Sequence, residues 1–366
     1  MSAAAALSCI AVGGGTGVPS CTPRAIGVAA TSSVRAVRVL ITGAAGMVGT
    51  KLAERLARDG VLAGVPIEHV RLADVVRPER QVLTGLDTDV VVGDLANQGV
   101  AVDLLEGFPD VIFHLAAVVS AAAERDLDQG YRTNLDGMRL LLEGIRAQSS
   151  EYRPRVVFAS SIAVFGAPFP EVIGDQQCLS PLTSYGAQKA IGELLLSDYS
   201  RRGFLDGIGV RLPTICVRPG KPNAAASGFF SSIIREPLNG EQAVLPVPDD
   251  TRHWHASPRS AVGFLIHAAT LDTRLLGDRR CLTMPGVSVT VAEQIEALRR
   301  VAGEEVIRRI RREPDDAIMA IVAGWPRDFD ARRALALRFS AETDFEEIIR
   351  IHIEDELGGA VPGVPV

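Results

Sequence analysis

The sequence has no excess of positive charge and no long hydrophobic run. Its 366 residues include 38 Lys and Arg against 44 Asp and Glu, which gives a net charge of −6 and a pI near 5.6. Proteins that bind nucleic acid or anionic membranes neutralise phosphates with surplus Lys and Arg, so this composition argues against both kinds of partner. No segment stays apolar over the roughly 20 residues that a membrane-spanning helix needs. A globular protein with small-molecule partners is therefore expected.

Cysteine is scarce and follows no metal-binding or disulfide pattern. No two of the five cysteines are separated by two residues, and their number is odd. This usage indicates neither a zinc site nor a disulfide framework. It favours a reducing compartment, so we expect a cytoplasmic protein. The cysteines are Cys9, Cys21, Cys178, Cys216 and Cys281.

The first 36 residues differ in composition from the rest of the chain. They are rich in Ala, Gly, Ser and Thr, include Arg24 and Arg35, and precede the first acidic residue, Glu54. Because they offer no apolar periodicity to bury, residues 1–36 are interpreted as a disordered leader. An organellar transit peptide is the alternative, since such leaders are also poor in acidic residues. Residues 358–366, which are Gly, Ala, Pro and Val, are expected to form a flexible tail.

A glycine-rich turn follows the leader. The run Val39–Gly49 reads VLITGAAGMVG, in which a β-branched segment ends at Thr42 and an amphipathic pattern follows the glycines. This order predicts a strand, a tight turn and a helix. Gly43 lets the backbone leave the strand, Gly46 lets a pyrophosphate approach without a Cβ in the way, and Gly49 lets the helix pack on the sheet. The N–H groups of the first helical turn then point at the phosphates.

An acidic residue ends the next predicted strand. The apolar segment Ile67–Ala73 runs into Asp74, which lies 25 residues after Gly49. A carboxylate at this place accepts hydrogen bonds from both hydroxyls of an adenosine ribose and repels a 2′-phosphate, which predicts NAD rather than NADP. Arg77 supports the alternative, because an arginine can accommodate the extra phosphate.

Two further predicted strands end in small or acidic residues. One runs into Asp94 and Leu95, and the other runs into Leu115, Ala116 and Ala117. In a doubly wound parallel sheet, ligands bind outside the carboxyl ends of the strands. These strand ends are therefore expected to meet at one site.

The fifth predicted strand ends in Ser160 and Ser161, and Tyr185 and Lys189 begin the helical pattern that follows. A spacing of four puts the phenol and the ammonium on one face of the helix. An ammonium within a few ångströms stabilises a phenolate and lowers its pKa from near 10 toward the working pH. A Ser hydroxyl from a neighbouring strand end can hold a reacting oxygen against Tyr185. The pattern favours acid–base chemistry over four unrelated surface residues.

Together these motifs resemble those of a known family. They occur in the order Gly43-x-x-Gly46-x-x-Gly49, Asp74, Asp94-Leu95, Leu115-Ala116-Ala117, Ser160-Ser161-Ile162-Ala163-Val164-Phe165-Gly166, Tyr185-x-x-x-Lys189 and Arg211-Leu212-Pro213-Thr214-Ile215. Over about residues 37–355 the chain resembles the extended short-chain dehydrogenase/reductases of the NAD-dependent epimerase/dehydratase family. The resemblance implies an NAD-dependent enzyme in which Tyr185 is the general base or acid. Lys189 would tune it and bind the nicotinamide ribose, and Ser161 would position the substrate oxygen.

The resemblance also implies which residues contact the cofactor. The segment from Pro213 to Ile215 would line the nicotinamide. Asn134, if buried in its helix, would hold a backbone group or a water near the site. The expected cofactor set is Gly43, Gly46, Met47, Val48, Gly49, Asp74, Asp94, Leu95, Leu115, Ala116, Ala117, Asn134, Ser160, Tyr185, Lys189, Pro213, Thr214 and Ile215.

Two departures from the family pattern bear on the substrate. Phe165 stands where a Tyr is usual, and residues 218–240 differ from the segment typical of nucleotide-sugar epimerases. That segment, together with SSIAVFG, resembles the D-erythronate dehydrogenase branch, which implies oxidation of the C2 hydroxyl of a small aldonic acid to a 2-oxo acid. A small acid needs cations, and Arg218, Lys221 and Arg252 lie in the region expected to cover the site, unless they are solvated surface charges. The expected substrate contacts are Ser161, Tyr185, Arg218 and Arg252.

His253 and His255 flank Trp254 and could suggest a metal-binding pair. No carboxylate or Cys lies at ligand spacing from them. We therefore expect no bound metal.

The sequence as a whole predicts an α/β fold, a doubly wound parallel sheet (Rossmann) with a smaller C-terminal substrate-binding region. Residues 37–222 would form the NAD-binding domain, and residues 223–357 mainly the substrate-binding region, with some segments returning to the sheet. The helices over 131–148 and 184–201 could pair in a homodimer or equally well pack on the sheet.

Three functions are compatible with this fold. The preferred one is an NAD-dependent dehydrogenase that acts on a small sugar acid. The alternatives are a nucleotide-sugar epimerase and a catalytically idle dinucleotide-binding sensor. Intact Ser161, Tyr185 and Lys189 argue against the sensor, because a sensor needs no tuned phenol.

Overall fold

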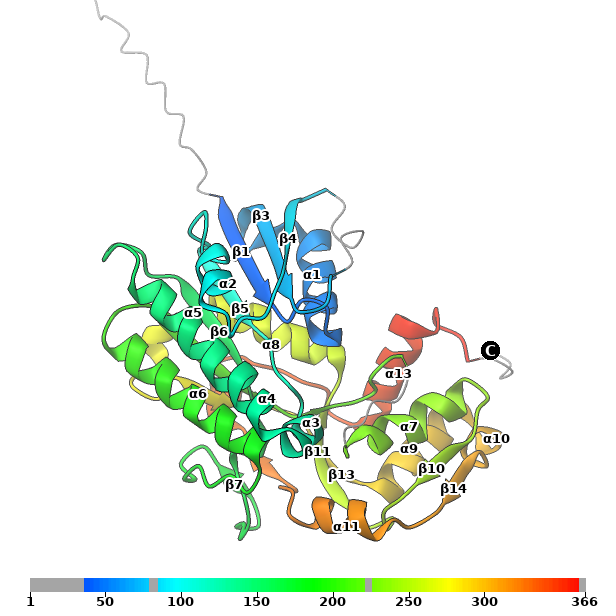
Figure 1. The fold of residues 1–366 in the computed structure, drawn as a ribbon. Helices are drawn as coiled ribbons and strands as arrows, with labels where there is room; N and C mark the ends of the chain where they lie inside the picture. The colour runs from blue at the N-terminus through cyan, green and yellow to red at the C-terminus, as the bar shows by residue number, and fades with distance from the viewer. Residues whose placement is uncertain (1–35, 79–84, 221–225, 362–366) are drawn as a thin grey trace, which may run out of the picture. The chain divides into compact units, whose positions relative to one another are not determined.

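The structure, a computed structural model, describes residues 36–78, 85–220 and 226–361 (Figure 1). All of these residues belong to one unit that begins at Arg35. The leader predicted over residues 1–36 lies outside the described residues except for its last position. Lys221 and the last five residues of the predicted tail lie outside them as well.

An eight-stranded sheet is built around β1, the strand that leads into the glycine turn. Seven strands are parallel, in the order β4-β3-β1-β5-β6-β8-β12, and β2 pairs antiparallel with β3. From β1 the chain moves outward to β3 and β4 and then returns to β5 on the other side, which is the doubly wound arrangement. The predicted fold class is confirmed. The strands are β1 (Val37–Thr42), β2 (Val61–Leu62), β3 (Val65–Asp74), β4 (Asp87–Val92), β5 (Val111–His114), β6 (Arg155–Ser161), β8 (Asp206–Leu212) and β12 (Cys281–Thr283).

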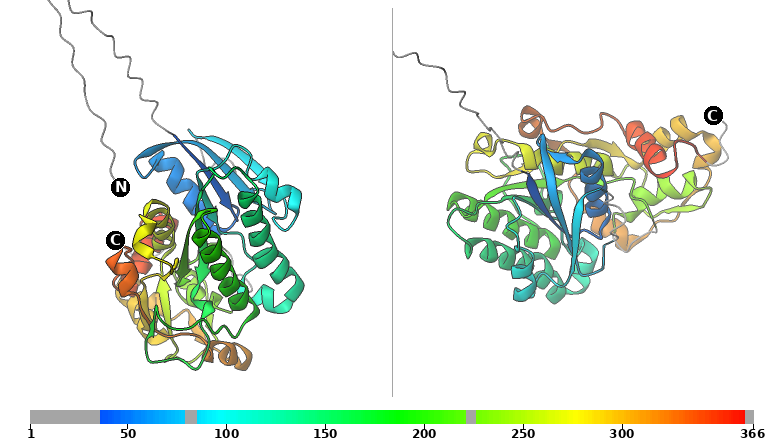
Figure 2. Two further views of the ribbon diagram at one scale, coloured as in Figure 1. Left: turned by 90° about the vertical axis from the view of Figure 1, so that its left-hand side faces the viewer. Right: turned by 90° about the horizontal axis from the view of Figure 1, so that it is seen from above.

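Helices cover both faces of this sheet (Figures 1 and 2). On one face, α1 (Met47–Asp59) and α8 (Pro258–Thr270) pack into a core that includes Leu52, Leu56 and Phe264. On the other, α2 (Gln98–Asp103), α5 (Gly137–Arg146) and α6 (Ser184–Arg201) pack into a second core. The amphipathic pattern predicted after the glycines forms α1, which buries Leu52, Ala53 and Leu56, and its C-cap is Gly60 in the left-handed region with φ 65°.

The helix predicted over residues 131–148 is interrupted. The structure has α4 (Leu127–Tyr131), a π-helical turn (Arg132–Asp136) and then α5. The π turn contains the buried Asn134, whose side-chain amide bonds to the backbone of Val118. Such a turn is a common device for aiming one side chain inward, and spacing alone did not indicate it.

A smaller region with its own core lies beyond the carboxyl ends of the sheet strands (Figure 1). It is joined to the sheet where the chain leaves β8 and pairs β9 with β11. Thr290 and Glu293 form a capping box in this region. The remaining strands are β7 (Ile173–Gly174), β9 (Thr214–Ile215), β10 (Ala243–Leu245), β11 (Arg252–Ala256), β13 (Val287–Thr290), β14 (Ile310–Arg312) and β15 (Phe329–Asp330). The remaining helices are α3 (Ser120–Arg125), α7 (Gly228–Leu238), α9 (Val291–Ala302), α10 (Glu304–Ile307), α11 (Asp316–Ala323), α12 (Arg332–Ala336) and α13 (Phe345–Glu356). In the part of the chain that the structure describes, no helix has the length and apolarity to cross a membrane.

Replacement of Gly49 by alanine is expected to destabilise the fold. A Cβ at this position would lie 2.3 Å from the carbonyl oxygen of Gly43 and 2.8 Å from Cα of Ala44, both backbone atoms. Overpacking of this kind typically costs about 1–3 kcal/mol in the free energy of unfolding, which denaturant titration measures. The matched control is Gly263→Ala in α8, where a Cβ would meet nothing within 4 Å. Because alanine is the better helix former, the control should be neutral or stabilising, and equal losses in both variants would contradict the close packing at Gly49.

Candidate active site

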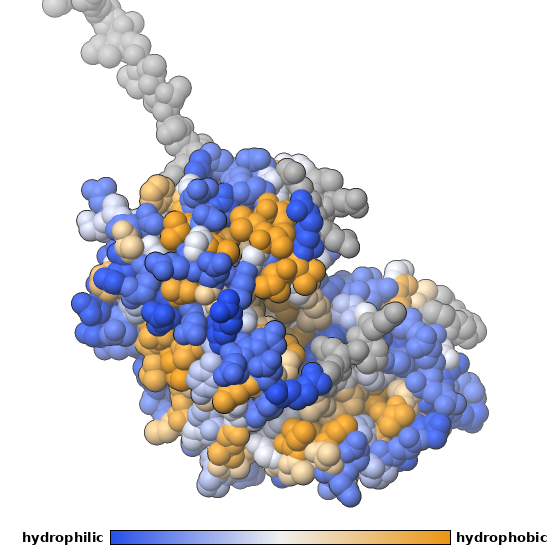
Figure 3. Space-filling view, viewed as in Figure 1, coloured by the Kyte–Doolittle hydropathy of each residue, from blue (hydrophilic) through white to orange (hydrophobic). Residues whose placement is uncertain are grey.

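A cavity of about 490 Å³ opens at the carboxyl ends of β1, β5, β6 and β8. Figure 3 shows a hollow with apolar walls below the strands of the sheet. Fifteen residues of the predicted site line the cavity, so the structure brings together motifs that are far apart in the sequence. They are Gly43, Gly46, Met47, Val48, Gly49, Leu115, Ala117, Ser160, Ser161, Tyr185, Lys189, Pro213, Thr214, Ile215 and Arg218.

The glycine turn has the geometry that a dinucleotide needs. Gly43 has φ +74°, and a Cβ there would lie 2.6 Å from the backbone nitrogen of Ala116, so the turn passes directly against the end of β5. The N-cap of α1 is Gly46, which supplies no side-chain cap, and the first turn of the helix has no acidic residue. Its first N–H groups are therefore left for a phosphate. These residues fit a dinucleotide cofactor.

Two acidic residues of the predicted cofactor set lie at strand ends beside the cavity. The carboxylate of Asp74 accepts hydrogen bonds from the backbone nitrogens of Ala45, at 2.9 Å, and Val76, at 3.2 Å, which fixes it next to the glycine turn. Asp94 pairs with Arg132 at 2.8 Å. Neither carboxylate lines the cavity itself, and Leu95 and Ala116 do not line it either. Contacts of these residues with a cofactor stay predictions.

The position of Asp74 leads to a test of cofactor choice. Asp74→Ala is expected to raise kcat/KM with NADP relative to NAD by about 10-fold, because removal of the charge ends the repulsion of a 2′-phosphate. Steady-state kinetics with both cofactors measure the ratio. Asp59→Ala is the control. It also removes one negative charge, at the C-terminal end of α1 and away from the glycine turn, and it should leave the ratio unchanged. Equal or better use of NADP by the wild type would instead assign the choice to Arg77.

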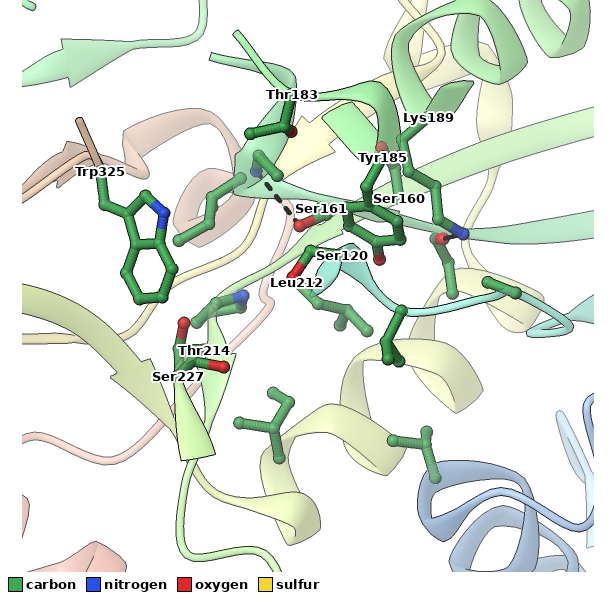
Figure 4. A pocket seen from close by; sticks show the side chains of 18 of the residues that line it. Ser120, Ser160, Ser161, Thr183, Tyr185, Lys189, Leu212, Thr214, Ser227 and Trp325 are labelled. Carbon is green, nitrogen blue, oxygen red and sulfur yellow. Dashed lines mark hydrogen bonds between the residues drawn. The ribbon is translucent and has the colours of Figure 1, made fainter. Parts of the chain in front are cut away.

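The tyrosine, the lysine and the serine form one cluster on the cavity wall (Figure 4). Tyr185 and Lys189 lie on the same face of α6, and Lys189 Nζ lies 5.7 Å from the centre of the Tyr185 ring. Lys189 Nζ donates a hydrogen bond of 2.8 Å to the carbonyl oxygen of Ala159. Ser161 Oγ accepts one of 3.1 Å from the backbone nitrogen of Ala163. The lysine thus keeps two ammonium hydrogens for other partners, and the serine keeps its hydroxyl hydrogen for the phenol of Tyr185 or for a ligand.

Burial shifts the pKa values of both titratable groups in this cluster. It raises the pKa of Tyr185, while a hydrogen bond with Ser161 and the charge of Arg218 act in the opposite direction. Burial lowers the pKa of Lys189 to about 8, and the carboxylate of Glu193 opposes that change. The sequence interpretation attributed the lowering of the phenol pKa to Lys189. That role of Lys189 stays a prediction, and the structure adds Arg218 as a second positive charge that acts to lower the pKa of Tyr185.

Two polar residues of the predicted cofactor set are held by the protein itself. Ser160 Oγ donates a hydrogen bond of 2.6 Å to Glu193, which is buried and paired with Arg211. Asn134 does not line the cavity. Its amide bonds to Val118 and to the side chain of Gln188 on α6. Asn134 therefore ties the segment after β5 to α6, and its role in cofactor binding stays a prediction.

Among the described residues, Arg218 is the cation that lines the cavity besides Lys189. Its Nε donates to the carbonyl oxygen of Ile215 at 3.0 Å, and its Nη2 donates to Ser227 Oγ at 3.1 Å. No carboxylate among the described residues lies within ion-pair distance of it. Arg252 was predicted alongside it, but it does not line the cavity, and its guanidinium pairs with Glu293 at 3.2 Å. Lys221 lies outside the described residues.

Sequence reasoning missed the part of the cavity wall that tertiary contacts supply. His253 reaches the cavity because β11 pairs with β9, and its ring bonds to Thr214 Oγ1 at 2.7 Å and to the carbonyl oxygen of Pro326 at 2.9 Å. Within the described residues, no group of three or more His, Cys, Asp and Glu could hold a metal ion. The lining residues that were missed include Ser120, Thr183, Ser227, His253, Trp325 and Pro326.

A second cavity of about 1530 Å³ adjoins the first and shares Ser120, Thr183 and Trp325 with it. Its charged lining is mainly acidic. A single arginine, Arg125, faces five carboxylates among the described residues that line it. These are Glu124, Glu236, Glu241, Glu313 and Asp315.

Some known proteins that are similar to this chain are described as having one of two activities. The model of the NAD-dependent epimerase/dehydratase family matches residues 39–255. D-erythronate dehydrogenase of Cupriavidus necator is 50% identical over 326 residues, which cover 87% of this chain and 98% of that protein. D-erythronate dehydrogenase of Haemophilus influenzae is 43% identical over 335 residues, which cover 88% of this chain and 100% of that protein.

A solved structure adds the second activity. The protein from Agrobacterium tumefaciens described as a nucleoside-diphosphate-sugar epimerase is 62% identical, with a TM-score of 0.87. The match covers 89% of this chain and 96% of that chain. Both a dehydrogenase and an epimerase must therefore be weighed against the geometry of the cavity.

Proposed function

Since the chain belongs to the NAD-dependent epimerase/dehydratase family, we propose that it is an NAD-dependent dehydrogenase that oxidises the C2 hydroxyl of a small aldonic acid such as D-erythronate to the 2-oxo acid. The observation that carries this proposal is Arg218. It is a cation with no carboxylate partner among the described residues, and it shares the cavity with Ser161, Tyr185 and Lys189. A guanidinium that no carboxylate of the described residues neutralises suits a carboxylate ligand, which it can bind with two parallel hydrogen bonds.

The residues of the cavity can perform the proton transfer of such a reaction. Ser161 would donate its free hydroxyl hydrogen to the C2 oxygen, and Tyr185 as phenolate would take the C2 hydroxyl proton. Lys189 would bind the ribose of the cofactor with the two hydrogens that Ala159 leaves free. NAD, when bound, would supply the acceptor for the hydride from C2. Arg218 would hold the substrate carboxylate and favour the phenolate.

Nucleotide-sugar epimerisation is the second candidate, because a protein described as an epimerase is 62% identical. A nucleoside diphosphate needs room beyond the reacting sugar and cations for its phosphates. The adjoining cavity has the room, but its described charged residues are Arg125 and five carboxylates, of which Glu236 and Glu313 pair with Arg235 and Arg311. Because like charges repel across such a cavity, the acidic lining favours the small acid over the nucleotide sugar.

A substrate panel tests the proposal. Purified protein with NAD is mixed with aldonic acids, including D-erythronate, and separately with nucleotide sugars, and NADH absorbance is followed. We expect NADH with D-erythronate and none with the nucleotide sugars. Conversion of a nucleotide sugar to its epimer without net NADH would replace the proposal by the epimerase.

The proposal also assigns roles to the two parts of the chain. Residues 37–222 would hold NAD, and residues 223–357 would mainly supply the substrate side of the cavity, with Ser227, His253 and Trp325 as its contribution. A cytoplasmic location is proposed because the three described cysteines are free thiols. Pairing of α5 and α6 in a homodimer stays a prediction.

A further inference from the structure

His253, one of the two histidines that suggested a metal pair, fixes the direction of a hydrogen bond in the cavity wall. Its Nδ1 lies 2.9 Å from the carbonyl oxygen of Pro326, and its Nε2 lies 2.7 Å from Thr214 Oγ1. A carbonyl oxygen can only accept a hydrogen bond, so Nδ1 must carry a proton. The remaining question is whether Nε2 carries one as well.

The surroundings of the His253 ring keep it neutral. The side chain is buried, it stacks on Phe230 at 5.2 Å between ring centres, and the rings of His255 and Trp325 lie 5.4 and 5.3 Å away. This burial lowers the pKa of His253 to about 4, with the charge of Arg218 acting in the same direction and the Pro326 carbonyl opposing it. Nε2 of the neutral ring has only a lone pair to offer, so the hydroxyl of Thr214 must donate to it.

Thr214 therefore presents only lone pairs to the cavity. A threonine hydroxyl has one hydrogen and two lone pairs, and here Thr214 donates that hydrogen in the hydrogen bond to Nε2 of His253. A ligand group that faces this oxygen must be a donor, which selects a hydroxyl and disfavours a carboxylate or a phosphate. The nearby Arg218, whose Nε bonds to the carbonyl of Ile215, presents only donors. Along this wall, Thr214 therefore offers a hydrogen-bond acceptor, whereas Arg218 offers hydrogen-bond donors.

We propose that Thr214 is a specificity-determining residue that accepts a hydrogen bond from the substrate hydroxyl on C3, the carbon adjacent to the reacting carbon C2. His253 is the positioning residue that holds Thr214 in this role. This inference rests on the proposed oxidation of a small 2-hydroxy acid. With the carboxylate at Arg218 and the C2 hydroxyl at Tyr185 and Ser161, the next hydroxyl along the chain is that at C3. The wall would therefore select 2,3-dihydroxy acids over acids that lack the C3 hydroxyl.

The test compares kcat/KM for D-erythronate with that for its 3-deoxy analogue. We expect the wild type to prefer D-erythronate by about 10-fold or more, since an acceptor left unpaired in a cavity is costly. In Thr214→Val, which keeps the shape and removes the acceptor, the ratio should fall to near 1, and Thr214→Ser should restore it. A Thr214→Val variant that keeps the wild-type ratio would overturn the inference while leaving the proposed function in place.

A double-mutant cycle tests whether His253 acts through Thr214. His253→Phe should lower the substrate ratio in the wild-type background, and it should have no further effect on the ratio in the Thr214→Val background. Equal effects in both backgrounds would show that His253 acts independently and would overturn its positioning role.

A readout without substrate separates this inference from the proposed function. Long-range proton–nitrogen NMR correlation at neutral pH, with the His253 signals assigned by their absence in His253→Phe, reports which ring nitrogens are protonated. We expect the neutral ring with the proton on Nδ1. If the wild type forms no NADH with D-erythronate, the proposed function fails, whereas a protonated Nε2 would overturn the hydrogen-bond direction on which the Thr214 inference depends.

Discussion

Tyr185→Phe is expected to lower kcat for the sugar acid by about 10²-fold or more, which is the usual contribution of a positioned general base. The substitution removes only the phenol oxygen from a side chain on the cavity wall, so the affinity for NAD should hardly change. Steady-state kinetics give kcat, and quenching of protein fluorescence on titration with NAD gives the affinity.

Tyr199→Phe is the matched control for this variant. Tyr199 lies on the same helix, but its hydroxyl bonds to Glu143 and it does not line the cavity. The control should keep wild-type kcat, whatever its effect on stability. Near-wild-type activity of Tyr185→Phe would remove the base from the proposed mechanism and would support the sensor.

Arg218→Ala is expected to raise KM for the sugar acid by about 10- to 100-fold, because hydrogen bonds to a charged group are lost. The variant should also change the pH dependence of kcat. The charge of Arg218 lowers the pKa of Tyr185, so its removal raises that pKa. The base is the phenolate, and the rise of kcat with pH should therefore move to higher pH.

Two further arginine variants separate these effects. Arg218→Lys keeps the charge and loses the planar fork, so its pH profile should stay near that of the wild type while KM remains raised. Arg252→Ala removes an arginine that pairs with Glu293 away from the cavity, and its kinetics should be unchanged. A larger rise of KM in Arg252→Ala than in Arg218→Ala would exchange the two assignments.

Motifs that depend on local geometry were predictable from the sequence. The turn at Gly43 to Gly49 needs small residues at fixed positions, and the spacing of Tyr185 and Lys189 defines a helix face. Both kinds of pattern appear directly in the sequence. The doubly wound fold class follows from the alternation of most strands with helices, because right-handed crossovers leave few other topologies. The fold class and the part of the cavity wall formed by the glycine turn, Tyr185 and Lys189 could therefore be predicted.

The part of the cavity wall that His253 and Pro326 form with Thr214 could not be predicted, because long-range contacts create it. Thr214 and His253 meet only when β9 pairs with β11, and Pro326 reaches the ring across 73 residues of sequence. Arg218 and Arg252 look alike in the sequence, but in the structure Arg218 lines the cavity, whereas Arg252 pairs with Glu293 away from it. The π turn around Asn134 is set by a contact with Val118, which periodicity does not encode.

The most direct measurement of the central claim uses D-erythronate carrying deuterium at C2, incubated with the protein and NAD. Mass spectrometry of the reduced cofactor and of the product then locates the label. The account predicts that the deuterium appears in NADH, in equal amount to a 2-oxo acid that has lost it. NADH without deuterium beside a product that retains it would place the oxidation at another carbon. The absence of any NADH, with conversion of nucleotide sugars instead, would contradict the dehydrogenase.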